Sequence, residues 1–155
     1  MPSRRTEQLI HETLCYRPPQ NGTCFVVNEP GLRLISGDAS SLPALRAALL
    51  DIAEAGNWRQ HFGLDHVIGA FLVLGTKYSP ETLAPFIRGL PGPFMREVVT
   101  AIPAFFQKRA TTGAYNFGVA PASALVDLVE ELAVSEDLLM QKTAKRVLRL
   151  IHGKE

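Results

Sequence analysis

Apolar residues return three times along this chain at a spacing that places them on one side of a helix. Positions i, i+3, i+4 and i+7 share one helical face, so each set marks an apolar stripe. A proline lies near the start of each stripe, at Pro43, Pro80 and Pro121, where the first helical turn does not need its missing N–H. The stripes are Leu45, Ala48, Leu49 and Ile52; Leu83, Phe86, Ile87 and Leu90; and Leu125, Leu128, Val129 and Leu132. They predict three amphipathic helices.

A second helical segment follows each of these three helices. Gly56, Gly89 and the sequence "VSED" at 134–137 supply the breaks between partners. Pro103 falls inside the middle segment, so we expect a kink or a shorter helix there. The second segments are 58–75, 93–109 and 136–151. The chain from residue 40 to residue 152 is therefore predicted to form three helical hairpins.

The spacing of the hairpins suggests a repeat. The first helices are offset by 38 residues, from Leu45 to Leu83, and then by 42 residues, from Leu83 to Leu125. In these offsets and in proline placement, residues 40–152 resemble HEAT or armadillo-type α-solenoids, without a family signature sequence. The resemblance implies that each hairpin buries its stripe against the next and that the second helices line a concave face. The alternative is an irregular six-helix bundle.

The N-terminal part, residues 1–38, does not show the helical-hairpin pattern. Residues 3–16 predict a short helix that "RPPQNG" at 17–22 ends. The β-rich runs "TCFVV" (23–27) and "LRLIS" (32–36) flank "NEPG", which predicts a β-hairpin. We expect a mainly α protein of one domain, 1–155, in which this helix and hairpin cap the helical hairpins at 40–152.

Composition limits the partners. The 155 residues are 46% apolar, enough for a core, and the net charge of +1 gives no overall field toward nucleic acid or membrane. The most apolar stretch, 67–75, is far shorter than the roughly 20 residues that span a bilayer. No signal-peptide pattern follows the first residues. We expect a cytoplasmic protein with no membrane partner, in which Cys15 and Cys24 remain reduced thiols.

The sequence lacks the common catalytic motifs, G-x-S-x-G, G-x-x-x-x-G-K-[ST] and G-x-G-x-x-G. In "HFGLDH", His61 and Asp65 stand at i and i+4, with His66 one residue further. Such a group suggests a metal or hydrolase site, or simply a hydrogen bond on a helix face. Zinc usually takes three or four protein ligands, so we favour the hydrogen bond. We expect no enzyme activity, no cofactor and no metal.

The last predicted helix carries a basic stripe. Its cations repeat the i, i+3, i+4, i+7 pattern: Lys142, Lys145, Arg146 and Arg149. Three interpretations are open: a solvated face balanced by the acidic helix before it, a contact for an acidic protein, or a contact for nucleic-acid phosphates.

The loop "TTGAYNFG" at 111–118 joins the second hairpin to the third and is longer than the connection requires. Tyr115 and Phe117, two residues apart, are either partner anchors or a plug between hairpins.

Trp58 and Arg59 are also residue types enriched in interfaces. In a HEAT-like stack, the second helices would bring these two residues into one groove with His61, Asp65, Arg96 and the basic stripe. We therefore expect a non-enzymatic protein-binding module, an adaptor or an immunity or antitoxin-like protein, that uses this groove and the 111–118 loop. The first alternative is a nucleic-acid-binding helical-repeat protein that uses the C-terminal basic helix. A hydrolase or metal site at His61, Asp65 and His66 comes last.

Overall fold

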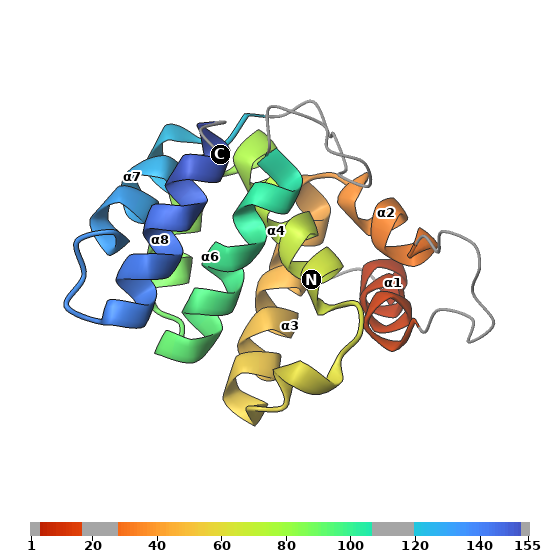
Figure 1. Ribbon diagram of the computed structural model, residues 1–155. Helices are drawn as coiled ribbons and strands as arrows, with labels where there is room; N and C mark the ends of the chain where they lie inside the picture. Colours follow the sequence, from red (N-terminus) through yellow and green to blue (C-terminus); the bar gives the residue numbers. More distant parts are fainter. Residues whose placement is uncertain (1–3, 17–27, 107–119, 153–155) are drawn as a thin grey trace, which may run out of the picture. The chain divides into compact units, whose positions relative to one another are not determined.

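A computed structural model describes residues 4–16, 28–106 and 120–152 (Figure 1). Within these ranges the chain forms α-helices and two short 3-10 turns, with no β-strand, which confirms the prediction of a mainly α protein. None of the helices found there is long and apolar enough to cross a membrane. The chain divides into two compact units, Met1–Leu74 and Gly75–Glu155.

The first unit contains three complete helices, both 3-10 turns and most of a fourth helix. Its elements are α1 (Arg4–Cys15), α2 (Glu29–Ile35), η1 (Ala39–Ser41), α3 (Leu42–Ala55), η2 (Trp58–Gln60) and α4 (Leu64–Tyr78), whose last turn belongs to the second unit. The second unit contains α5 (Pro80–Arg88), α6 (Gly92–Phe106), α7 (Ser123–Leu132) and α8 (Leu138–Ile151).

The apolar stripes form the buried faces of α3, α5 and α7, as predicted, except that Leu90 lies two residues past the end of α5. Nine of their twelve residues are buried, and Ala48, Phe86 and Leu132 are half-buried. Pro43 and Pro80 lie in the first turns of α3 and α5, whereas Pro121 precedes α7. Helix α6 continues past Pro103 to Phe106.

The predicted β-hairpin is wrong in its second strand, because residues 32–35 belong to helix α2. The side chain of Asn28 accepts a hydrogen bond of 3.0 Å from the amide of Gly31, which caps the helix, and Pro30 fits its first turn. The sequence "NEPG" thus starts a helix and makes no turn between strands. The predicted first strand, 23–27, lies outside the described residues.

The predicted helix at 58–75 is wrong at its start. Residues 58–60 form the short turn η2, and the α-helix begins only at Leu64. Gly63 explains the break, since a Cβ there would lie within 1.9 Å of the carbonyl oxygen of Thr13 in α1. The backbone passes against α1 at this point, and the chain turns before α4 begins.

Within the second unit, α6 and α8 lie side by side and run in the same direction, and α7 contacts both α8 and α5 (Figure 1). The last turn of α4 packs closely on α5, because a Cβ on Gly75 would come within 2.5 Å of Cδ2 of Leu83. A regular repeat over residues 40–152 is not confirmed, and the solenoid remains a hypothesis.

Candidate functional site

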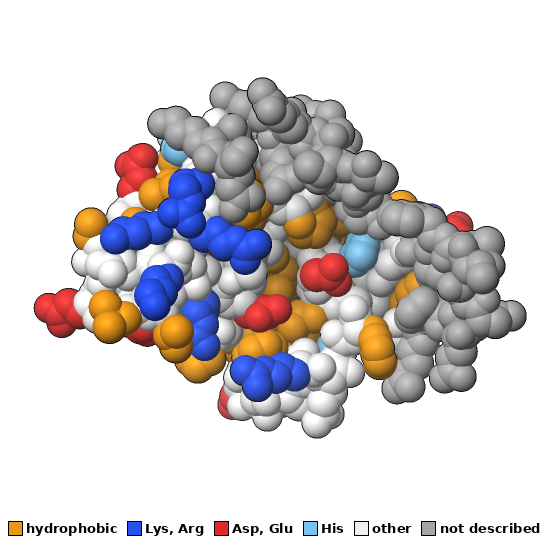
Figure 2. All heavy atoms as spheres, in the orientation of Figure 1, with side chains coloured by type: hydrophobic (Ala, Val, Ile, Leu, Met, Phe, Trp, Pro, Cys, Tyr) orange, Lys and Arg blue, Asp and Glu red, His pale blue; other side chains and the backbone are white. Residues whose placement is uncertain are grey.

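Helix α8 separates its side chains into a buried face and a charged face. Lys142, Lys145, Arg146 and Arg149 are all exposed, as their spacing predicts. Figure 2 shows Lys and Arg side chains gathered over this helix. The opposite face is buried and consists of Met140, Ala144, Val147 and Ile151. Because packing of the apolar face fixes the position of the helix, the backbone that carries the cations is also fixed.

The four cations have no carboxylate partner among the described residues, where none of them forms an ion pair within 4.0 Å. Glu131 of the acidic helix α7 pairs with a residue outside α8. Its carboxylate accepts two hydrogen bonds from Arg88 of α5, at 3.1 and 3.3 Å. The solvated-face interpretation assumed that α7 balances α8, but the structure shows no ion pair between them. The α8 cations thus retain their hydrogen-bond donors for water or a partner.

Two leucines extend the charged face at the start of α8. Leu138 and Leu139 are 67% and 60% exposed. They lie four and three residues before Lys142, and this spacing places them on the same side of the helix. Asp137 fixes the first turn, because its carboxylate accepts hydrogen bonds from the amides of Leu139 and Met140. We use the name α8 face for Leu138, Leu139, Lys142, Lys145, Arg146 and Arg149.

Leu138 and Leu139 are not among the partner-binding residues predicted from the sequence. The apolar residues at 140, 144, 147 and 151 share one helical face. This spacing places positions 138 and 139 on the opposite side of the helix, where they are expected to be exposed. Val134, in the turn before α8, is 78% exposed and adds to the apolar end of this region.

The other predicted partner-binding residues are distributed over both units. Arg96 is half-buried in the second turn of α6, the helix beside α8. Trp58 and Arg59 lie in η2 of the first unit, with the guanidinium of Arg59 4.8 Å from the centre of the indole ring. The single groove that would unite these residues with the basic stripe stays a prediction. Tyr115, Phe117 and the whole 111–118 loop lie outside the described residues.

The histidine cluster differs from its predicted geometry. His61 lies in the turn before α4 and Asp65 in its first turn, so the expected one-turn helical relationship between them is wrong. Asp65 instead pairs with its neighbour His66, with 3.1 Å between Oδ1 and Nδ1. His66 is buried, whereas the Asp65 side chain is 64% exposed. In the part of the chain that the structure describes, no three His, Cys, Asp or Glu residues are grouped to hold a metal ion.

The His66 contact also sets the acidity of Asp65. Burial alone raises the pKa of the carboxyl group, but the hydrogen bond and the charge of His66 outweigh this effect, and the pKa lies below its usual value. The pair therefore stabilises the ionised carboxylate at the start of α4, where the helix dipole also favours a negative charge.

Comparisons with protein-family models, with curated proteins and with solved structures found no match.

Proposed function

We propose that this protein is a non-enzymatic protein-binding module whose α8 face binds an acidic segment of another protein. The observation that supports this proposal is the composition of that face. Four exposed cations, none of which has a carboxylate partner in the described structure, lie on the same side of α8 as two exposed leucines. An adaptor, or an immunity or antitoxin-like protein that covers a toxin, would use such a face.

The α8 face has the dimensions of a short recognition site. Leu138 and Arg149 are eleven residues apart, which corresponds to about 16 Å along the helix axis. Burying the two leucines under a partner would contribute about 2–4 kcal/mol. Each exposed ion pair would add only about 0.2–1 kcal/mol, and the cations would mainly orient the partner and speed its association. The partner segment therefore needs an aliphatic anchor as well as carboxylates.

The apolar end of the face favours a protein over nucleic acid. Leucine side chains are aliphatic, whereas bases of single strands stack on aromatic rings. Glu136 and Asp137 lie at the same end of α8 and would repel phosphates. An acidic amphipathic segment of a protein satisfies both the leucines and the cations.

The experiment is an affinity capture from cells with matched variants. Nuclease-treated lysate is passed over the wild-type protein, over the Lys145→Glu/Arg146→Glu variant and over the Leu138→Ser/Leu139→Ser variant. The control variants are Lys77→Glu and Leu50→Ser, which change an exposed cation and an exposed leucine outside the α8 face. We expect one protein that the wild type and both controls retain and that both α8 variants lose. Its acidic segment, made as a peptide, should then bind with the same dependence on the variants.

Nucleic-acid binding would give a different result. Material would be recovered only from lysate without nuclease, and affinity for double-stranded DNA would fall with salt at a log–log slope of about −3.6 if all four cations neutralise phosphates. A captured protein that all five forms retain equally would also overturn the proposal.

A further inference from the structure

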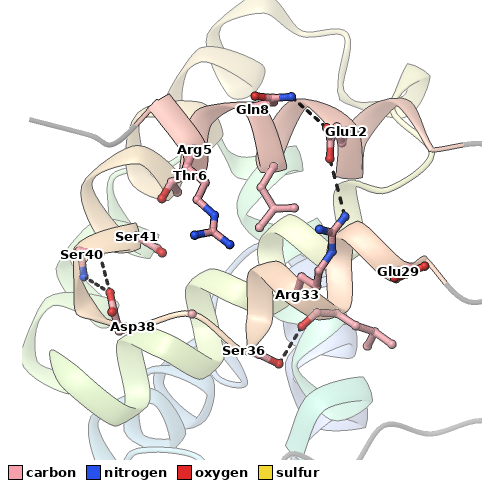
Figure 3. Close-up of a pocket in the computed structure, with 13 residues that line it drawn as sticks. Arg5, Thr6, Gln8, Glu12, Glu29, Arg33, Ser36, Asp38, Ser40 and Ser41 are labelled. Atoms are coloured by element: carbon pink, nitrogen blue, oxygen red, sulfur yellow. Dashed lines mark hydrogen bonds and ion pairs between the residues drawn. The ribbon is translucent and has the colours of Figure 1, made fainter.

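A polar cavity of about 750 Å³ lies in the first unit, between α1, α2 and the turn that leads into α3 (Figure 3). Its walls carry two arginines, Arg5 from α1 and Arg33 from α2, and apolar surface from Leu9 and Leu32. This site is separate from the residues of the α8 face, and no feature of the protein-binding proposal uses it.

Two of the three carboxylates that line the cavity have partners within the chain. Glu12 accepts a hydrogen bond of 3.2 Å from Gln8 and lies 3.9 Å from Arg33. Asp38 accepts hydrogen bonds from the amide and the hydroxyl of Ser40, at the start of η1. Glu29 projects away from Arg5 in Figure 3. Glu12 and Asp38 are thus engaged within the chain, whereas no partner of Glu29 is found among the described residues.

The arginines do have unused capacity. The Arg5 guanidinium extends from α1 into the cavity (Figure 3), and no carboxylate of the described residues lies within 4.0 Å of it. Arg33 reaches Glu12 with one nitrogen only, at 3.9 Å, well beyond the 2.7–2.9 Å of a charge-assisted hydrogen bond. The cavity therefore offers guanidinium N–H donors from two helices, α1 and α2, beside the three carboxylates of its lining.

We propose that this cavity binds a small molecule that carries a carboxylate or phosphate group, with Arg5 as its main contact and Arg33 as the second. A guanidinium presents two parallel N–H groups whose geometry matches both kinds of anion. The volume is typical of sites for metabolite-sized ligands, and Leu9 and Leu32 provide the apolar wall that such sites usually have.

The test is a titration of the full chain with inorganic phosphate and, separately, with citrate, followed by amide chemical shifts in a buffer free of both anions. We expect saturable shifts in α1 and in residues 36–41. Loss of a hydrogen bond to a charged group should raise the Kd at least about tenfold in Arg5→Gln and by a smaller factor in Arg33→Gln. The matched control is Arg46→Gln on α3, which does not line the cavity and should change the Kd less than twofold.

Each outcome decides the proposal. Saturable binding of phosphate alone, of citrate alone or of both supports it and names the anion class, provided that Arg5→Gln weakens it. Absence of saturation, or equal Kd values for Arg5→Gln and Arg46→Gln, overturns it. Arg5→Lys keeps the charge but loses the paired N–H geometry, so its weaker binding would show that the guanidinium itself is used. Far-UV circular dichroism of each variant confirms that the helices are retained.

Discussion

Gly31 of α2 lies directly against the imidazole of His66 in α4, so closely that a methyl group on Gly31 would come within 2.7 Å of Cδ2 of His66. The same junction joins α1, because the side-chain amide of Asn28 donates a 3.2 Å hydrogen bond to the carbonyl of Thr13. Gly63 passes close to that carbonyl. Small residues and one buried amide thus hold three helices of the first unit together.

Replacing Gly31 with alanine should lower the free energy of unfolding by about 1–3 kcal/mol, because the new methyl group would overlap Cβ, Cγ and Cδ2 of the buried His66 side chain. Urea denaturation measures this change. Gly92→Ala is the control, since nothing lies within 4 Å of a Cβ at that helix position. The control should be neutral or slightly stabilising. Equal stabilities of the two variants would show that α2 moves away from His66 at little cost.

Replacing Asn28 with alanine should cost about 2–3 kcal/mol, because the change removes both the helix cap of α2 and the bond to Thr13. Asn28→Asp separates the two effects, since it keeps the acceptor of the cap and loses the donor. Its unfolding free energy should lie between those of wild type and Asn28→Ala. If the aspartate variant is as unstable as the alanine variant, repulsion between its second carboxylate oxygen and the Thr13 carbonyl offsets the contribution of the cap.

The Asp65–His66 pair should give the protein a defined acid sensitivity. The pKa of Asp65 is lowered in the folded state, so its contribution to stability is complete above the unfolded value, near pH 4, and is lost as the pH falls through the folded value. The difference in unfolding free energy between wild type and Asp65→Asn should therefore shrink as the pH is lowered from about 5 through the unfolded value. The side chain is 64% exposed, so we expect less than about 1 kcal/mol. A difference that stays constant over this range would contradict the assignment.

The leucines of the α8 face should be dispensable for folding. Leu138→Ser/Leu139→Ser should change the unfolding free energy by no more than about 0.5 kcal/mol per site, because both side chains are exposed. Val147→Ala on the buried face of the same helix should cost about 2 kcal/mol. Thermal denaturation followed by circular dichroism compares the two variants. A large loss in the leucine variant would mean that these residues pack within the protein and are not available to a partner.

The aromatic loop supplies a fifth prediction. If Tyr115 and Phe117 are anchors, replacing both with alanine should weaken partner binding at least tenfold and leave stability unchanged. If they plug a gap between hairpins, the same change should lower the unfolding free energy by several kcal/mol. Measuring both quantities on one double variant separates the two interpretations.

Periodicity predicted the helices well, because burial of one side of a helix leaves a direct trace in the sequence. The stripes of α3, α5 and α7, and the break at Gly56, are examples. Gly56 adopts φ +71° at the end of α3, a conformation that favours glycine. Where the outcome depended on distant contacts, the prediction was wrong. "NEPG" has the composition of a turn, yet Asn28 also bonds to α1, and "HFGLDH" is broken by the approach of Gly63 to α1.

The candidate sites were predictable only in part. The exposed cations of α8 follow from their spacing, because four residues on one helix need no tertiary information. Arg5 and Arg33 are separated by 28 positions, and no local pattern indicates that α1 and α2 bring them to one cavity.

The order of residues along α8 has one further consequence. Its apolar end is fixed at Leu138 beside the capping carboxylate of Asp137, and its cations follow toward Arg149. The face is thus asymmetric along its length, and it distinguishes the two directions in which a chain can cross it. A peptide with its aliphatic anchor and its carboxylates in the opposite order would place negative charge beside Asp137 and leucines beside lysines. For the peptide binding proposed above, this order of residues would therefore determine the direction of the bound chain.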